Sequence, residues 1–248
     1  MTIKTIGVVG GGVMGSGIAQ ALAVGGAKVT IRDVNDEIIA KSRSTIVDGR
    51  YGLERGVERG KTTRTDAGAA LARLSWTTDI EGLAKVDLII EAVPEDLELK
   101  KRVFGEADGI VEAGAIFASN TSGLAISDLN KAVSEARRPR FIGMHFFSPA
   151  PVMKLVEIIH APETSEETIA TIEEMCARAG KATVRVKDAP GRYGFIANRI
   201  YFAAVREAQK VLEEGIATPE DINKAMVMGF NWPVGPLAMI EGATKGWQ

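Results

Sequence analysis

The first 120 residues alternate short, apolar, β-branched runs with longer segments of helical spacing. The apolar runs are residues 3–10, 28–33, 86–93 and 115–120. The helical segments between them are residues 13–26, 35–60 and 95–112. Strands that are apolar on both faces and separated by helices are typical of a parallel sheet buried on both sides. The pattern therefore predicts an α/β fold with a doubly wound, mainly parallel sheet.

The end of the chain has a different pattern, in which apolar positions recur at helical spacing. The predicted helices are residues 196–213, 218–229 and 235–246. Thr218, Pro219 and Glu220 suit the N-cap and the first two positions of the second helix. The first helix has its apolar positions at Tyr201, Ala204, Val205, Ala208, Val211 and Leu212. We therefore expect two domains, a sheet domain at 1–187 and a smaller all-α domain at 188–248.

The composition argues against several classes of protein. The 248 residues carry a formal net charge of −2 and few aromatic side chains, a balance that does not suit a nucleic-acid-binding protein. A single cysteine, Cys176, cannot form an internal disulfide, and with only two histidines no transition-metal site is expected. The first residues do not have the pattern of a signal peptide, so we expect a cytoplasmic protein.

Residues 5–27 are uncharged and long enough to cross a bilayer. However, their consecutive glycines separate a β-branched run from an alanine-rich periodic stretch. That order is typical of a strand, a turn and a helix, so we expect no membrane span.

The glycines after the first strand have a spacing that carries chemistry. Gly10, Gly12 and Gly15 form a Gly-x-Gly-x-x-Gly motif, in which the first allows a tight turn, the second lets the backbone approach a pyrophosphate and the third lets helix and strand pack closely. Asp33 follows at the end of the second strand, where an acid accepts hydrogen bonds from an adenosine ribose. The pattern predicts a Rossmann-type domain that binds NAD rather than NADP, a preference that the neighbouring Arg32 could weaken.

Four polar residues elsewhere have two interpretations each. His145 and Glu157 lie in apolar runs, where a histidine is usually a satisfied core residue and a glutamate usually marks an edge strand. Ser122 and Asn198 stand where a helix could begin, so both could be caps. Alternatively, all four belong to a catalytic site. The residue pattern alone leaves both interpretations open.

Five segments together resemble the L-3-hydroxyacyl-CoA dehydrogenases, in the order expected of that family. They are VVGGGVMGSGIAQ (8–20), IIEAVPEDLELKKRVF (89–104), FASNTSGL (117–124), GMHFFSPAPVMKLVEII (143–159) and PGRYGFIANRI (190–200). The resemblance runs from about residue 4 to the end of the chain. It is strongest to the short-chain, fatty-acid-oxidation or hydroxybutyryl-CoA branch.

The resemblance implies a role for each of the four polar residues. It makes His145 the general base and Glu157 the residue that orients it. It places Ser122 against the substrate oxygen and the nicotinamide end, and Asn198 near the substrate carbonyl. The cofactor contacts that the motif and the resemblance together imply are Gly10, Gly12, Val13, Met14, Gly15, Asp33, Glu95, Lys100 and Ser148. The implied cofactor is NAD, and the implied partners are an acyl-CoA substrate and a second subunit in a homodimer.

Three features depart from the family pattern. Ser148 stands where many relatives have asparagine, and the shorter side chain puts its contact with the nicotinamide amide in doubt. Residues 192–194 are extra relative to the common PGF sequence and could reshape the acyl pocket. The chain ends at GATKGWQ, whereas relatives usually continue with further helices, so we expect a helical domain shorter than usual, whether native or truncated.

Two other functions compete with the leading interpretation. The same scaffold could oxidise a free hydroxy acid, or the chain could be a non-catalytic NAD-binding or structural relative. The phosphates of coenzyme A require a basic site, and the basic residues of the 50–64 region are Arg50, Arg55, Arg59, Lys61 and Arg64. Glutamates alternate with them, so an ordinary salt-bridged surface explains them equally well.

Overall fold

A single sheet of eight strands, in the order β3-β2-β1-β4-β5-β6-β7-β8, organises the larger part of the chain. The computed structural model describes residues 2–244, and its contacts divide the chain into two units, residues 1–193 and 194–248. The strands are β1 (Thr5–Val9), β2 (Lys28–Arg32), β3 (Leu74–Thr77), β4 (Leu88–Glu91), β5 (Ile116–Ser119), β6 (Phe141–Phe146), β7 (Leu155–His160) and β8 (Ala182–Lys187). All neighbours pair in parallel except β6 and β7. The predicted mainly parallel, doubly wound sheet is confirmed.

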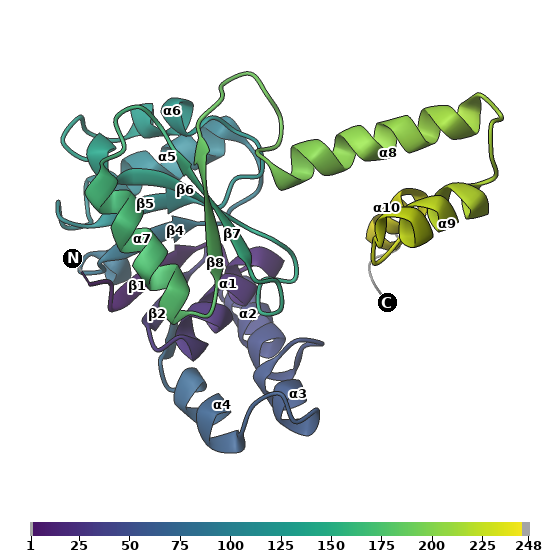
Figure 1. Ribbon diagram of the computed structural model, residues 1–248. Coiled ribbons are helices and arrows are strands. Elements are labelled where there is room, and N and C mark those ends of the chain that lie inside the picture. The colour runs from purple at the N-terminus through teal and green to yellow at the C-terminus, as the bar shows by residue number, and fades with distance from the viewer. Residues whose placement is uncertain (1, 245–248) are drawn as a thin grey trace. The chain divides into compact units, whose positions relative to one another are not determined.

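Helices cover both faces of this sheet (Figure 1). They are α1 (Val13–Val24), α2 (Asp36–Asp48), α3 (Leu53–Glu58), α4 (Arg64–Leu71), α5 (Leu97–Asp108), α6 (Ile126–Leu129) and α7 (Glu166–Arg178). Short 3₁₀ turns lie at Ile80–Leu83, Asn130–Ala132 and Arg138–Arg140. Strand β5 shows how the two faces divide, since Ala118 joins the core beneath α1 and α7 while Phe117 stacks on Phe104 of α5. Both faces of the central strands are therefore buried, as their apolar sequences predict.

The register of the parallel strands aligns their carboxyl ends. Val9 of β1 lies opposite Glu91 of β4, which lies opposite Ser119 of β5, and Ser119 lies opposite Gly143 of β6. The chain order reverses between β1 and β4, so the segments that leave these two strands diverge to opposite sides. A crevice at such a switch point is where doubly wound sheets bind their ligands.

The predicted helical segment at 35–60 is two helices rather than one. Helix α2 ends at Asp48 and α3 begins at Leu53. The glycines between them explain the break, since a Cβ on Gly49 would lie 2.3 Å from the carbonyl oxygen of Thr45 and one on Gly52 would lie 2.7 Å from that of Val47. The chain therefore turns tightly here, and α3 and α4 extend away from the sheet (Figure 1).

Residues 194–244 form a separate helical unit. It contains α8 (Ala197–Glu213), α9 (Pro219–Phe230) and α10 (Pro236–Thr244), which agree with the three predicted helices as far as residue 244; the predicted residues 245–246 lie outside the described part. Thr218 caps α9 by accepting a hydrogen bond from Asp221 N, with Pro219 at the first helical position, as predicted. Asn223 of α9 accepts hydrogen bonds from the first N–H groups of α10, which joins these two helices.

The linker between the units begins beside the sheet. The Asp188 carboxylate accepts hydrogen bonds from Ile126 N and Ser127 N at 3.1 and 2.8 Å, so this residue is anchored to the start of α6. The contacts place the division after Tyr193, whereas the sequence predicts it at 187–188, and that boundary stays a prediction. Residues 5–27 form β1, a turn and α1, as expected. Among the described residues no helix is both long and apolar enough to cross a membrane.

Candidate active site

The glycine motif connects β1 to α1 at the crevice. Gly10 has a φ of +108°, and a Cβ there would lie 2.7 Å from the Ala92 carbonyl oxygen. A Cβ on Gly15 would lie 1.8 Å from the Gly10 carbonyl oxygen, so both positions require glycine. Gly12 is different, because a Cβ there would meet nothing within 4 Å.

Gly12 is also the N-cap of α1, and no side chain caps that end of the helix. The first N–H groups of α1 therefore have no cap from a described side chain, and the positive end of the helix dipole lies there, an arrangement that fits a pyrophosphate. Val13, which follows, is 74% exposed, and Met14 is half-buried against the core. The motif thus fits the phosphates of a dinucleotide, and the separate contacts of Val13 and Met14 with a cofactor stay predictions.

Asp33 follows β2 immediately and lies beside the glycine turn. One carboxylate oxygen accepts a hydrogen bond from Gly11 N at 2.5 Å, and the other accepts from Val34 N at 2.6 Å. These bonds hold the carboxylate next to the pyrophosphate turn, where the ribose of a dinucleotide would extend. A fixed anion in this position favours two ribose hydroxyls over a ribose phosphate.

His145 and Glu157 face each other across the only antiparallel pair of the described sheet. They occupy opposite positions in the β6–β7 register, and His145 Nδ1 lies 2.7 Å from a Glu157 carboxylate oxygen. His145 is 3% exposed and Glu157 is fully buried. Polar groups at this depth require hydrogen-bond partners, and this contact supplies one to each of them. The hairpin therefore turns a separation of 12 residues in the chain into a direct contact.

The end of β6 is tied to the end of β5. Asn120, the residue after β5, accepts a hydrogen bond from Phe146 N through its side chain at 2.9 Å. Its own N–H donates to the carbonyl oxygen of Glu91. These bonds extend the pairing of the strands by one residue. They fix the position of His145 along its strand relative to the loop after β5. Ser148 is exposed three residues further on, and its predicted cofactor contact stays a prediction.

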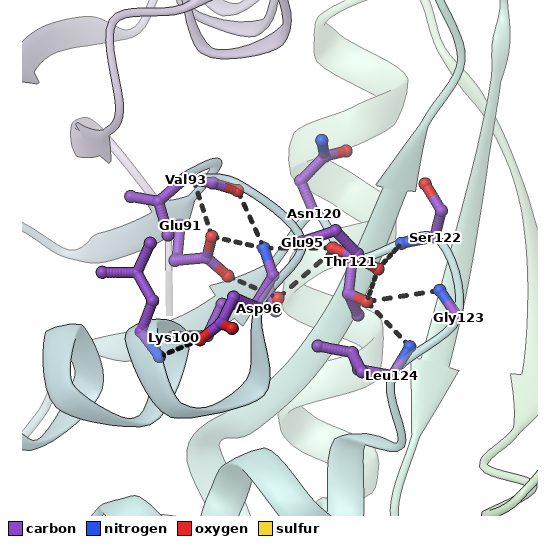
Figure 2. Close-up of polar contacts among 12 residues, drawn as sticks. Glu91, Val93, Glu95, Asp96, Lys100, Asn120, Thr121, Ser122, Gly123 and Leu124 are labelled. Atoms are coloured by element: carbon purple, nitrogen blue, oxygen red, sulfur yellow. Dashed lines mark hydrogen bonds and ion pairs between the residues drawn. The ribbon is translucent and has the colours of Figure 1, made fainter.

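Three other predicted residues meet in one network at the ends of β4 and β5 (Figure 2). Lys100 is 1% exposed, and its ammonium group lies 2.6 Å from Glu91 and 3.3 Å from Glu95. Glu95 accepts hydrogen bonds from Thr121 Oγ1 at 2.5 Å and from Ser122 N at 2.9 Å. The structure thus brings Glu95, Lys100 and Ser122 together. The contacts of Glu95 and Lys100 with the cofactor stay predictions.

Two capping interpretations from the sequence are wrong. The hydroxyl that caps the loop after β5 belongs to Thr121, which accepts hydrogen bonds from Gly123 N and Leu124 N, and not to Ser122. Helix α8 has Ile196 as its N-cap, without a side-chain hydrogen bond, and Asn198 is already inside the helix. Asn198 belongs to the helical unit, and its expected place near the substrate carbonyl stays a prediction.

Glu91 is a residue of this network that was not predicted from the sequence. It is the last residue of β4 and fully buried, and its carboxylate binds Lys100, Ser119 and Val93 N. Burial raises the pKa of this carboxyl, against the opposing effect of the Lys100 ammonium group and the other hydrogen bonds. A signal was present, since an acid in the apolar run 86–93 requires a partner.

The basic region 50–64 contains ion pairs with its own glutamates. Arg55 lies 2.8 Å from Glu58, and Arg64 lies 3.2 Å from Glu54. All four side chains are largely exposed. The interpretation as an ordinary salt-bridged surface accounts for these two arginines.

Comparison with known proteins identifies the family of this chain. Residues 5–189 match the family described as 3-hydroxyacyl-CoA dehydrogenase, NAD binding domain, and residues 194–247 match the C-terminal domain of the same enzymes. The chain belongs to the 3-hydroxyacyl-CoA dehydrogenase family. The resemblance inferred from the five segments is therefore confirmed, as are NAD as the cofactor and the assignment as an NAD-dependent dehydrogenase.

Relatives of this family from several organisms cover nearly the whole chain. The mitochondrial hydroxyacyl-coenzyme A dehydrogenase of Rattus norvegicus is 39% identical over 96% of this chain and 76% of its own length. The probable 3-hydroxybutyryl-CoA dehydrogenase of Bacillus subtilis is 40% identical over 97% of this chain and 81% of its own. The crystal structure of (S)-3-hydroxybutyryl-CoA dehydrogenase PaaH1 from Ralstonia eutropha has a TM-score of 0.90 at 43% identity and covers 96% of this chain, which spans 81% of that one.

The position of Asp33 leads to a prediction about cofactor choice. Asp33→Ala should raise the KM for NAD and relax discrimination against NADP, because the anion that repels a ribose phosphate is lost. Asp33→Asn is the matched variant, since its amide oxygen can still accept the hydrogen bond from Gly11 N while the charge is gone. Steady-state kinetics with both cofactors measure the two effects. An unchanged NAD preference in both variants would remove Asp33 from the ribose site.

Proposed function

We propose that this dehydrogenase converts an L-3-hydroxyacyl-CoA and NAD reversibly into the 3-oxoacyl-CoA and NADH. The observation that carries the proposal is the buried His145–Glu157 pair at the end of the sheet where the glycine motif and Asp33 also lie. The names of the relatives support the substrate class, since the proteins from rat and Bacillus subtilis are named for hydroxyacyl-CoA and 3-hydroxybutyryl-CoA. In that role the enzyme would serve fatty acid metabolism, in particular β-oxidation.

Oxidation of a secondary alcohol removes a proton from oxygen and a hydride from carbon. Bound NAD supplies the hydride acceptor. His145 removes the hydroxyl proton through Nε2, because Nδ1 is held by Glu157. An imidazole suits this task because its ordinary proton affinity matches neutral pH.

Glu157 orients the imidazole and stabilises its charge. Its hydrogen bond with Nδ1 fixes the ring tautomer that leaves Nε2 as the base. As the ring gains the proton, the buried carboxylate balances the new positive charge at 2.7 Å. The same pair returns the proton to the oxygen in the reverse reaction.

Ser122 and Asn198 complete the proposed site by holding the oxygens of the substrate. The Ser122 hydroxyl stands on the loop after β5, at the same edge of the sheet as His145. Asn198 is the second residue of α8, and its approach to the site is part of the proposal.

A cytoplasmic location remains a prediction from the sequence.

The substrate class can be tested directly. With NADH, the enzyme should reduce acetoacetyl-CoA, and with NAD it should not oxidise free hydroxy acids at a comparable kcat/KM. Absorbance of NADH measures both reactions. Activity confined to free hydroxy acids would favour the alternative dehydrogenase, and no turnover of either substrate despite NADH binding would favour the non-catalytic relative.

The buried pair leads to a prediction about turnover. His145→Gln should lower kcat by about 10²–10⁴-fold, the usual contribution of a general base, while NADH binding stays near normal. Glu157→Gln should also lower kcat, because its amide can hold the ring without stabilising the positive charge that forms on it. Near-wild-type turnover in either folded variant would make the pair a structural hydrogen bond.

We also propose that two copies associate through the helical unit. Large apolar side chains there are exposed, with exposed fractions of 65% at Ile200, 78% at Met228 and 75% at Phe230. Leu237 and Met239 of α10, in contrast, are half-buried. Apolar groups of this size are typical of an interface rather than of a monomer's surface.

Light scattering at micromolar concentration should therefore give the mass of a dimer. Ile200→Glu should shift the mass toward the monomer, because it would bury a charge in the interface. Val24→Glu, at an exposed valine of the sheet unit, is the matched control and should leave the mass unchanged. A wild-type protein that is monomeric under these conditions would contradict the proposal.

A further inference from the structure

The end of β4 carries a carboxylate that the proposed chemistry does not use. Glu91 is fully buried, and three groups donate hydrogen bonds to it, namely Val93 N at 2.7 Å, Lys100 Nζ at 2.6 Å and Ser119 Oγ at 2.6 Å. Replacing a buried ion pair by apolar side chains is often neutral or stabilising. Stability alone therefore does not explain why this strand ends in glutamate rather than in valine.

Glu91 is connected to the loop 120–124 in two ways, and the first is a chain of hydrogen bonds through Ser119. The single hydroxyl proton of Ser119 is donated to Glu91, so the Ser119 oxygen is left to accept a hydrogen bond, and it does so from Thr121 N at 3.2 Å. An ionised partner at position 91 thus determines which way the Ser119 hydroxyl points. That direction fixes the backbone of the residue before Ser122.

The second route runs through Lys100. Its ammonium group lies 2.6 Å from Glu91, 3.1 Å from the Val93 carbonyl oxygen and 3.3 Å from Glu95. The other oxygen of Glu95 accepts the Thr121 hydroxyl and Ser122 N (Figure 2). Glu91 therefore fixes the Lys100 ammonium group, and this group in turn fixes Glu95. Glu95 binds the loop at Thr121 and Ser122.

The loop itself completes this set of oriented hydrogen bonds. Thr121 Oγ1 accepts from Gly123 N and Leu124 N, so its own proton is directed to Glu95. Ser122 contributes only its backbone N–H to the network. Its hydroxyl takes no part, although the residues on both sides are fixed. A loop built in this way presents one hydroxyl in a defined position.

We propose that Glu91 is a positioning residue for the dehydrogenase reaction, and that with Lys100 and Ser119 it fixes the loop 120–124 so that the Ser122 hydroxyl is held in place for the substrate oxygen. The inference rests on the role of Ser122 in the proposed function. Glu91 acts through Ser122 and touches neither the substrate nor the reacting atoms. This role does not require Lys100 to touch the cofactor.

A double-mutant cycle tests the inference. Glu91→Gln, Ser122→Ala and the double variant are compared by kcat for acetoacetyl-CoA at saturating NADH. Each single change should lower kcat by about 10–100-fold, the scale of a misplaced catalytic contact. If Glu91 acts through Ser122, the double variant should be no slower than Ser122→Ala, because nothing is left to position.

Two further variants separate positioning from stability. Asp108→Asn breaks another ion pair, with Arg137 at the C-terminal end of α5, and should lower the Tm while leaving kcat unchanged. If Glu91→Gln does not fold, Ser119→Ala removes a single hydroxyl from the same network and takes its place in the cycle.

The outcomes are distinct. Losses that multiply in the double variant, or a wild-type kcat in Glu91→Gln, would show that Glu91 does not act through Ser122 and would overturn the inference. A wild-type kcat in Ser122→Ala would remove Ser122 from the proposed function and the inference with it. A loss in Ser122→Ala beside a wild-type kcat in Glu91→Gln would leave the proposed function intact and overturn the inference alone.

Discussion

The site depends on the register of the parallel strands, which aligns the carboxyl ends of β1, β4 and β5. Because Val9, Glu91, Ser119 and Gly143 lie opposite one another in turn, the segments after β1, β4 and β5 leave the sheet at one height. The glycine turn, the Glu95 segment and the Ser122 loop therefore begin along one edge. His145 lies two residues beyond Gly143, so it extends past that level toward the same edge. A shift of one residue in any pair would turn the side chains of that strand to the opposite face.

Burial on both faces of these strands sets a second condition. A polar side chain at the end of such a strand has no water to satisfy it, so its partner must come from a neighbouring element. His145 takes its partner from β7, and Glu91 takes partners from β5 and α5. The polar residues of the site are thus assembled in pairs across elements. Removal of one partner leaves a buried polar group with a hydrogen bond missing, which costs more than the loss of the contact itself.

The sequence was most informative where one local pattern determines the structure. The apolar runs predicted the central strands, and the glycine spacing predicted a turn in which Gly10 and Gly15 leave no space for a Cβ. The edge strands β3 and β8 gave no such run, because β8 is largely exposed and its sequence is mixed. The pairing of Glu91 with Ser119 joins residues 28 apart through the register of two strands, which no local pattern contains. The place of Asn198 depends likewise on how the linker folds.

The buried pairs Glu91–Lys100 and His145–Glu157 have similar geometry. Their roles differ because one contains an ammonium group and the other an imidazole. Each joins a buried carboxylate to a nitrogen at 2.6–2.7 Å. An imidazole can be neutral or charged at neutral pH, so the His145–Glu157 pair suits a proton that arrives and leaves in each turnover. The Lys100 ammonium group is enclosed by Glu91, Glu95 and the Val93 carbonyl oxygen, and the proposed reaction passes no proton through it. The Glu91–Lys100 pair is therefore a fixed dipole. A fixed dipole suits a scaffold, since the loop that it supports keeps one geometry while the proton on the histidine moves.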